Sequence, residues 1–202
     1  MGYNSLKRNL GYHLSDSTAA ITESIPLFAA FETFGAGMPV EVSLRARLLV
    51  IATAFAGMGY VFGGLRDLWR KLVKVDQTSP ERKQTIYDSA YGGLFNLILS
   101  PPLYLLSGCT EAKQIAIATG ISAAIGIVNG APVGYTIDAF RDFTGLKPSE
   151  RLPDLIKYRS RKAKLGIAAL LVTSSIALTA GIYSLASSMH KPDSLEQRIE
   201  KH

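Results

Sequence analysis

The sequence predicts an all-α fold, a polytopic membrane helix bundle of about five transmembrane helices. The first observation is that four segments of the chain carry no charged residue: 48–65, 89–110, 114–137 and 165–189. A helix needs about 20 apolar residues to cross the hydrocarbon core of a bilayer. The second observation is the distribution of basic residues, and the third is an internal repeat. Together they predict a multi-pass protein of the cell membrane.

A fifth span is expected at residues 17–38. This segment is apolar except for Glu23 and Glu32, and a charge at mid-bilayer costs about 3 kcal/mol on insertion scales. We still predict a span, because its neighbour at residues 48–65 needs an antiparallel partner. We do not expect a signal peptide, which would have a basic start, an uninterrupted apolar region and a small-residue cleavage site.

The lysines and arginines gather in alternate connecting segments. Sixteen of the 22 lie before the first span, between the second and third spans, or between the fourth and fifth. Basic loops remain in the cytosol during insertion, so this asymmetry predicts a cytosolic N-terminus. With five spans, the C-terminus would be external. The basic loops would also lie against anionic lipid headgroups.

The same distribution argues against several classes of function. The net charge of +6 lies in loops that flank the spans, so we expect no nucleic-acid partner. Cys109 is the single cysteine and the three histidines lie far apart, so no metal site or other cofactor is expected. No nucleophile motif and no Gly-x-x-x-x-Gly-Lys phosphate loop occurs. We therefore expect neither an enzyme nor an ATP-driven pump.

A two-helix unit occurs twice at an offset of 75 residues. Small residues, a tyrosine and an Arg-Asp pair recur in register: Ala56 and Ala131, Gly59 and Gly134, Tyr60 and Tyr135, Arg66 and Arg141, and Asp67 and Asp142. The same offset places Pro26 on Pro101. Because two helices return the chain to its starting side, the two copies should be parallel, related by an axis along the membrane normal.

The chain then divides into five parts. We expect a cytosolic segment at residues 1–16, a four-helix core at 17–145, a basic cytosolic linker at 146–164, a fifth helix at 165–189 and a polar tail at 190–202. The core holds repeat A at 17–70 and repeat B at 92–145. The sequence leaves open whether a homo-oligomer is needed to enclose a pathway.

Polar side chains at membrane depth are the candidate site residues. An ionisable group in a span faces the bundle interior or a water-filled cavity, and it is a functional candidate for that reason. Glu32 suits a proton carrier, and the alternative is an ion pair with Arg45 or Arg47. As a carrier it should lie between the helix pairs, near the polar residues of the later spans: Asn96, Ser100, Asn129 and Tyr135. Asp138 is one turn from Tyr135, and Glu23 lies on the opposite face of its helix from Glu32, nearer the cytosol.

Prolines and arginines mark other candidate positions. Pro26, Pro101 and Pro132 lie inside spans, where each frees a backbone carbonyl that a substrate could use or that packing could satisfy. The glycines of the second and fourth spans favour close helix packing over substrate contact. At the cytosolic helix ends, a structural role is favoured over a gate for three residues: Arg66, Asp67 and Arg141.

With these residues in hand, the chain resembles the small bacterial L-alanine exporter family, compact four-span proteins that expel alanine using the proton gradient. The resemblance covers about residues 16–143. It is carried by Glu32-Thr-Phe-x-x-Gly37-Met38, Ser43, Arg47-Leu48, Gly59-Tyr60, Arg66-Asp67-Leu68, Asp88, Ser100-Pro101, Tyr104 and Gly130-Ala131-x-x-Gly134-Tyr135-x-x-Asp138-x-x-Arg141-x-x-Phe143. This chain departs from the pattern by a displaced Ser100-Pro101, by Pro132 and by the additional fifth span and tail.

The resemblance implies a secondary transporter that exports a small, L-alanine-like amino acid in exchange for protons. Glu32 would carry the proton, and Asn96, Ser100, Asn129 and Tyr135 would bind the ammonium and carboxylate groups of the substrate. The alternative is a membrane scaffold or lipid-binding protein without transport, in which the buried polar groups only hold the bundle together.

Overall fold

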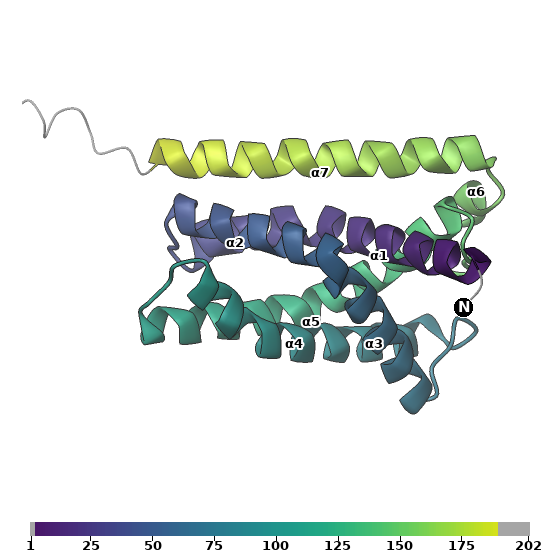
Figure 1. The fold of residues 1–202 in the computed structure, drawn as a ribbon, viewed down its shortest axis with the longest axis horizontal. Coiled ribbons are helices and arrows are strands. Elements are labelled where there is room, and N and C mark those ends of the chain that lie inside the picture. The colour runs from purple at the N-terminus through teal and green to yellow at the C-terminus, as the bar shows by residue number, and fades with distance from the viewer. Residues whose placement is uncertain (1–2, 190–202) are drawn as a thin grey trace, which may run out of the picture.

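Long helices joined by short turns form the described part of the chain, residues 3–189 of the computed structural model (Figure 1). In chain order the elements are α1 Tyr3–Ala30, η1 Phe31–Gly35, α2 Val40–Thr53, η2 Ala54–Met58, α3 Gly59–Leu72, α4 Glu81–Leu106, α5 Ala112–Phe143, α6 Asp154–Lys157 and α7 Arg161–Met189. No strand occurs within residues 3–189. The all-helical fold is therefore confirmed.

Three helices are long and apolar enough to cross a membrane. They are the continuous run Val40–Leu72, made of α2, η2 and α3, together with α5 and α7. α1 and α4 are long enough but more polar, since α1 contains Asp16 and Glu23, and α4 begins with Glu81 and contains Asp88. The structure thus supports a membrane protein with three candidate spans among its described residues.

The two ends of the bundle differ in character. The start of α1, the loop between α3 and α4, and α6 gather at one end, which we call the basic end (Figure 1). The short connections at residues 36–39 and 107–111 lie at the other, which we call the turn end. The three segments that hold most of the lysines and arginines therefore share one end of the molecule.

Glycines allow α4 and α5 to pack backbone to backbone. A Cβ atom built on Gly92 would lie 2.3 Å from the Gly126 carbonyl oxygen, and one on Gly130 would lie 2.3 Å from that of Asp88. No side chain fits in either space. Small residues at helix contacts serve this purpose in membranes, where lipid tails remove the hydrophobic drive for association.

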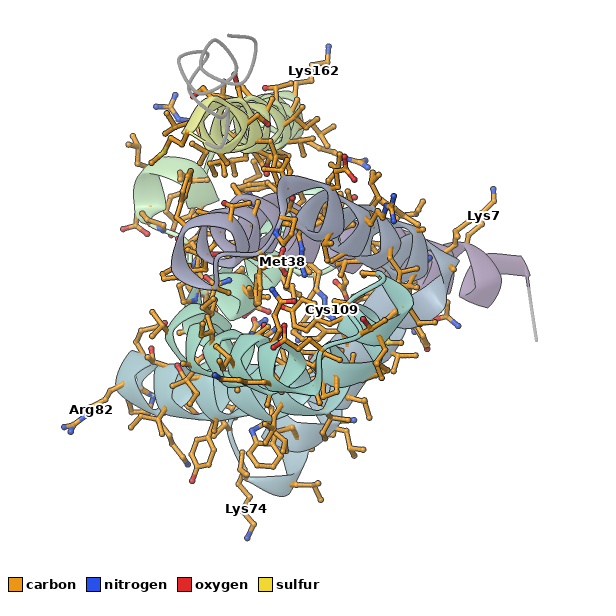
Figure 2. All side chains as sticks on the ribbon, turned by 90° about the vertical axis from the view of Figure 1, so that its left-hand side faces the viewer. Lys7, Met38, Lys74, Arg82, Cys109 and Lys162 are labelled. Atoms are coloured by element: carbon orange, nitrogen blue, oxygen red, sulfur yellow. The ribbon has the colours of Figure 1, made fainter. Side chains whose placement is uncertain are left out.

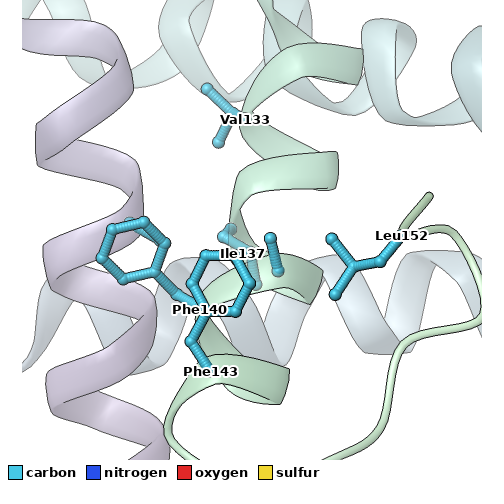
Figure 3. Close-up of a cluster of buried hydrophobic side chains, with 7 residues drawn as sticks. Val133, Ile137, Phe140, Phe143 and Leu152 are labelled. Carbon is cyan, nitrogen blue, oxygen red and sulfur yellow. The ribbon is translucent and has the colours of Figure 1, made fainter. Parts of the chain in front are cut away.

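An apolar core joins α1, α5 and the connection that follows α5. Figure 3 shows Val133, Ile137, Phe140 and Phe143 on α5, with Leu152 reaching them from the loop. Ala19 of α1 completes this contact. The expected linker at residues 146–164 is therefore folded against the bundle, and it contains α6 and the first turn of α7.

A second cluster closes the turn end. Met38 and Cys109 lie between the helices there, as Figure 2 shows, and they pack with Tyr104, Ala46 and Ala118. Lys7, Lys74, Arg82 and Lys162 instead extend from the periphery of the molecule.

Two short π-helical segments interrupt the first half of the chain. η1 carries Glu32, and η2 contains Gly57 at φ 130°, a conformation that an L-residue rarely adopts. π-Helical turns are rare and often lie at functional sites.

Of the other expected parts, residues 1–16 are helical from Tyr3 onward, and the polar tail at 190–202 lies outside the described residues.

Candidate functional site

Glu32 is the centre of a buried polar cluster at the turn end. Its carboxylate accepts hydrogen bonds from Arg47 Nη2 at 2.6 Å, Ser43 Oγ at 2.7 Å and the Tyr104 hydroxyl at 3.0 Å. Tyr104 also contacts Ser122 Oγ at 2.7 Å, and Ser43 contacts the Tyr183 hydroxyl at 3.1 Å. These six residues, the Glu32 cluster, join α1–η1, α2, α4, α5 and α7.

This geometry differs from the one expected for a proton carrier. The partners of Glu32 are not Asn96, Ser100, Asn129 or Tyr135. Its ion pair with Arg47 is the alternative that the sequence left open, and both side chains are almost fully buried, at 4% and 5% exposure. Protonating Glu32 would leave the Arg47 charge buried without a counterion, which costs about 3–5 kcal/mol.

Two arginine networks lie toward the basic end. Arg66 of α3 binds Asp88 of α4 at 3.0 Å, and it binds Asp138 of α5 at 3.2 Å. It also donates to the Gly134 carbonyl oxygen at 3.0 Å. Arg70, one turn further along α3, binds Asp88 as well. The Arg66 network therefore ties α3 to the α4–α5 pair.

Arg141 makes the reverse connection. From α5 it donates through Nε to Asp16 of α1 at 2.7 Å, and through Nη1 to Asp67 of α3 at 3.2 Å. The two arginines that recur in the sequence thus each bind carboxylates of the other helix pair. Close packing accompanies both contacts, since a Cβ atom on Gly63 would meet Asp16 and one on Gly134 would meet Asp88.

The loop after α5 contributes a further cation to the Arg66 network. Arg151 donates to Asp138 at 3.0 Å and to Glu81 at 3.1 Å. Burial alone would lower the pKa of Arg151, but its hydrogen bonds to Glu81 and Asp138 raise it above the ordinary value for arginine. The Arg151 guanidinium also lies over the Tyr135 ring, 5.5 Å from its centre. Tyr135 is therefore part of the basic end.

A cavity of about 320 Å³ lies between the Glu32 cluster and the arginine networks. Its wall is formed by residues of α1, α2, η2, α3, α4 and α5. Most of the lining is apolar, with polar side chains from six residues: Ser24, Arg47, Thr53, Asn96, Ser100 and Asn129. Arg47 belongs to both the cavity and the Glu32 cluster. The Arg47 Nε atom is buried and has no hydrogen-bond partner.

Three of the expected substrate-binding residues are thus brought together. Ser100 is 4% exposed, Asn96 donates to the Gly92 carbonyl oxygen at 2.9 Å, and Asn129 donates to Glu23 at 2.5 Å. Glu23 was expected nearer the cytosolic interface, yet it lies against the middle of α5.

The three expected prolines differ in their surroundings. Pro26 is buried in α1, Pro101 precedes the cavity residue Pro102 in α4, and Pro132 of α5 is exposed.

Several residues of these clusters carried no clear signal in the sequence. Ser122 and Tyr183 are single hydroxyl groups in apolar helices, and the fold brings them to the cluster through Tyr104 and Ser43. Arg70 is different, because it lies four residues after Arg66 and so shares its helix face.

Comparison with models of protein families, with curated proteins and with solved structures gives no match.

Proposed function

We propose that the protein is a secondary transporter that exports a small, L-alanine-like amino acid in exchange for protons. The observation that carries the proposal is the cavity between the helices, which lies along the bundle between the Glu32 cluster and the arginine networks. A site that alternates between two sides of a membrane needs a barrier on each side of it.

The cavity has the chemistry for a small zwitterion. Its volume of about 320 Å³ has ample room for a small amino acid. Amide and hydroxyl groups that can hydrogen-bond to an ammonium and a carboxylate come from Asn96, Ser100 and Asn129. Arg47 adds a buried N–H donor without a partner, and the apolar wall suits a methyl side chain.

The proposal includes five spans and a duplicated core. α1 and α4 would complete the membrane part, with their charged residues satisfied inside the bundle by partners such as Arg66 and Arg141. The reciprocal binding of these two arginines supports a parallel repeat. The offset of 75 residues also pairs Gly57, where η2 kinks, with Pro132. The two pairs are not identical in shape, since α5 continues through Pro132 without a π-helical segment.

Export of alanine from cells tests this function. Cells that lack other alanine exporters are loaded with alanyl-alanine, and external alanine is measured with the protein, with an S100F variant that fills the cavity, and with an empty vector. We expect efflux with the intact protein only, and its loss when an uncoupler removes the proton gradient. Efflux equal to the vector control would contradict transport of alanine, and would favour a scaffold or lipid-binding role.

A further inference from the structure

Glu23 differs from the other carboxylates buried in the bundle. Glu32, Asp88, Asp138 and Asp16 each bind an arginine. Glu23 is partly buried, and its hydrogen bond comes from the neutral amide of Asn129, at 2.5 Å. Among residues 7–189, for which side chains are described, no ion pair includes Glu23.

The Glu23–Asn129 pair lies halfway through the bundle, beside the cavity. Along α5, Asn129 is about 26 Å from Ala112 and about 21 Å from Phe143, at 1.5 Å per residue. Asn129 lines the cavity, and so does Ser24, the residue after Glu23. The amide of Asn129 therefore connects the Glu23 carboxyl group to the cavity wall. An intramembrane acid in such a place is a functional candidate.

Protonation has different consequences for the two kinds of acid. Adding a proton to Glu32 or Asp138 breaks an ion pair and leaves a buried arginine without its counterion. Glu23 can gain or lose a proton and keep its hydrogen bond. When ionised, it accepts from Asn129 Nδ2. When protonated, its O–H can donate to Asn129 Oδ1, because an amide presents a donor and an acceptor that exchange places on rotation.

Resting on the proposed function, we propose that Glu23 binds and releases the transported proton, and that Asn129 transmits its state to the cavity. With Glu23 ionised, Asn129 Oδ1 is left to accept from a substrate ammonium group, and the nearby negative charge favours that cation. With Glu23 protonated, the charge is gone and Asn129 turns its NH₂ group to the cavity. Proton and substrate then compete for the protein, as an antiporter requires.

Several titratable groups on the surrounding elements are bound to other residues. Arg47 of α2 binds Glu32, and Arg66 of α3 binds Asp88 and Asp138. Four tyrosines of α4, α5 and α7 are also engaged: Tyr91 with the Phe62 carbonyl oxygen, Tyr104 with Glu32, Tyr135 with Arg151 and Tyr183 with Ser43. On α1 itself, Asp16 binds Arg141, and His13 contacts the Phe55 carbonyl oxygen.

Two measurements on the purified full-length protein test this inference, with E23Q as the variant and E150Q, an exposed glutamate of the loop, as the matched control. The first is infrared spectroscopy between about pH 5 and about pH 9, which detects the carbonyl band of a protonated carboxyl group. We expect a pH-dependent band in the intact protein and in E150Q that is missing in E23Q. A band that persists unchanged in E23Q would overturn the inference.

The second measurement is transport in proteoliposomes. We expect E23Q to retain alanine counterflow, which needs no gradient, and to lose at least about tenfold in accumulation driven by a pH gradient. Counterflow also shows that the E23Q variant is folded. The E23D variant keeps a carboxyl group on a shorter side chain, and it should regain part of the gradient response. A wild-type gradient response in E23Q overturns the role of Glu23. Absence of alanine transport by the intact protein instead contradicts the proposed function, and the infrared band then decides on Glu23 alone.

Discussion

At the scale of single residues, the membrane interior separates two kinds of acid. An acid next to an arginine forms an ion pair that holds helices together, as Glu32 does with Arg47. An acid next to an amide can exchange its proton, as we propose for Glu23. Position in a helix does not distinguish them, since Glu23 and Glu32 lie in the same apolar segment. The partner decides the role.

The Glu32–Arg47 pair leads to a prediction about stability. E32Q should lower the free energy of unfolding by about 3 kcal/mol or more, because it leaves a buried guanidinium without a counterion. R45Q is the matched control, since Arg45 is two residues from Arg47 but exposed, and it should change the stability by about 0.5 kcal/mol or less. Thermal unfolding in detergent measures both. Equal small effects would mean that the ion pair contributes nothing.

At the scale of elements, glycine decides how closely α4 and α5 approach. G126A should destabilise the protein by about 1–3 kcal/mol, because its Cβ would lie 2.4 Å from the Gly92 carbonyl oxygen and the helices would have to separate. G120A, on the same helix, meets nothing within 4 Å. It should be neutral or stabilise by about 0.5–1 kcal/mol, since alanine restricts the unfolded chain. Unfolding temperatures that fall equally in the two variants would contradict this packing.

The helices themselves were largely predictable from the sequence, and their contacts were not. Charge-free segments located α2–α3, α5 and α7. Pro39, Pro80 and Pro153 stand just before α2, α4 and α6, because the missing N–H of proline costs no hydrogen bond at a helix start. The sequence also identified Asn96, Ser100 and Asn129, which line the cavity. It left the partner of Glu32 open between an arginine of the next helix and the polar residues of later spans, because helix periodicity gives the face of a residue but not the neighbour that this face meets.

At the scale of the whole molecule, the charges are sorted by end. The basic end collects the N-terminal end of α1, the α3–α4 loop and α6. If the positive-inside rule applies, this end faces the cytosol. In a C109S background, a cysteine at Lys74 should react with an impermeant maleimide only in inside-out vesicles, and a cysteine at Glu111 only in intact cells. Reaction of both positions from one side would contradict the orientation.

The arginine networks also predict how the cavity is closed toward the basic end. Arg141 holds Asp16 of α1 with both side chains almost fully buried, and Arg66 holds Asp88 and Asp138. If these contacts form the cytosolic barrier of a transporter, weakening one should favour the state that is open to the cytosol. Each 1.4 kcal/mol of lost stabilisation changes the ratio of two states about tenfold.

Cysteine accessibility measures this shift. Ser100 in the cavity wall is replaced by cysteine in a C109S background, and inside-out vesicles are treated with an impermeant maleimide. We expect D16N to increase the labelling rate at least about tenfold, because Arg141 loses its charged partner on α1. D154N is the control, since Asp154 is exposed at the same end of the molecule and its replacement should leave the rate unchanged. An unchanged rate in D16N would mean that the Arg141 network holds the bundle together without closing the cavity, because a barrier must respond when one of its ion pairs is removed.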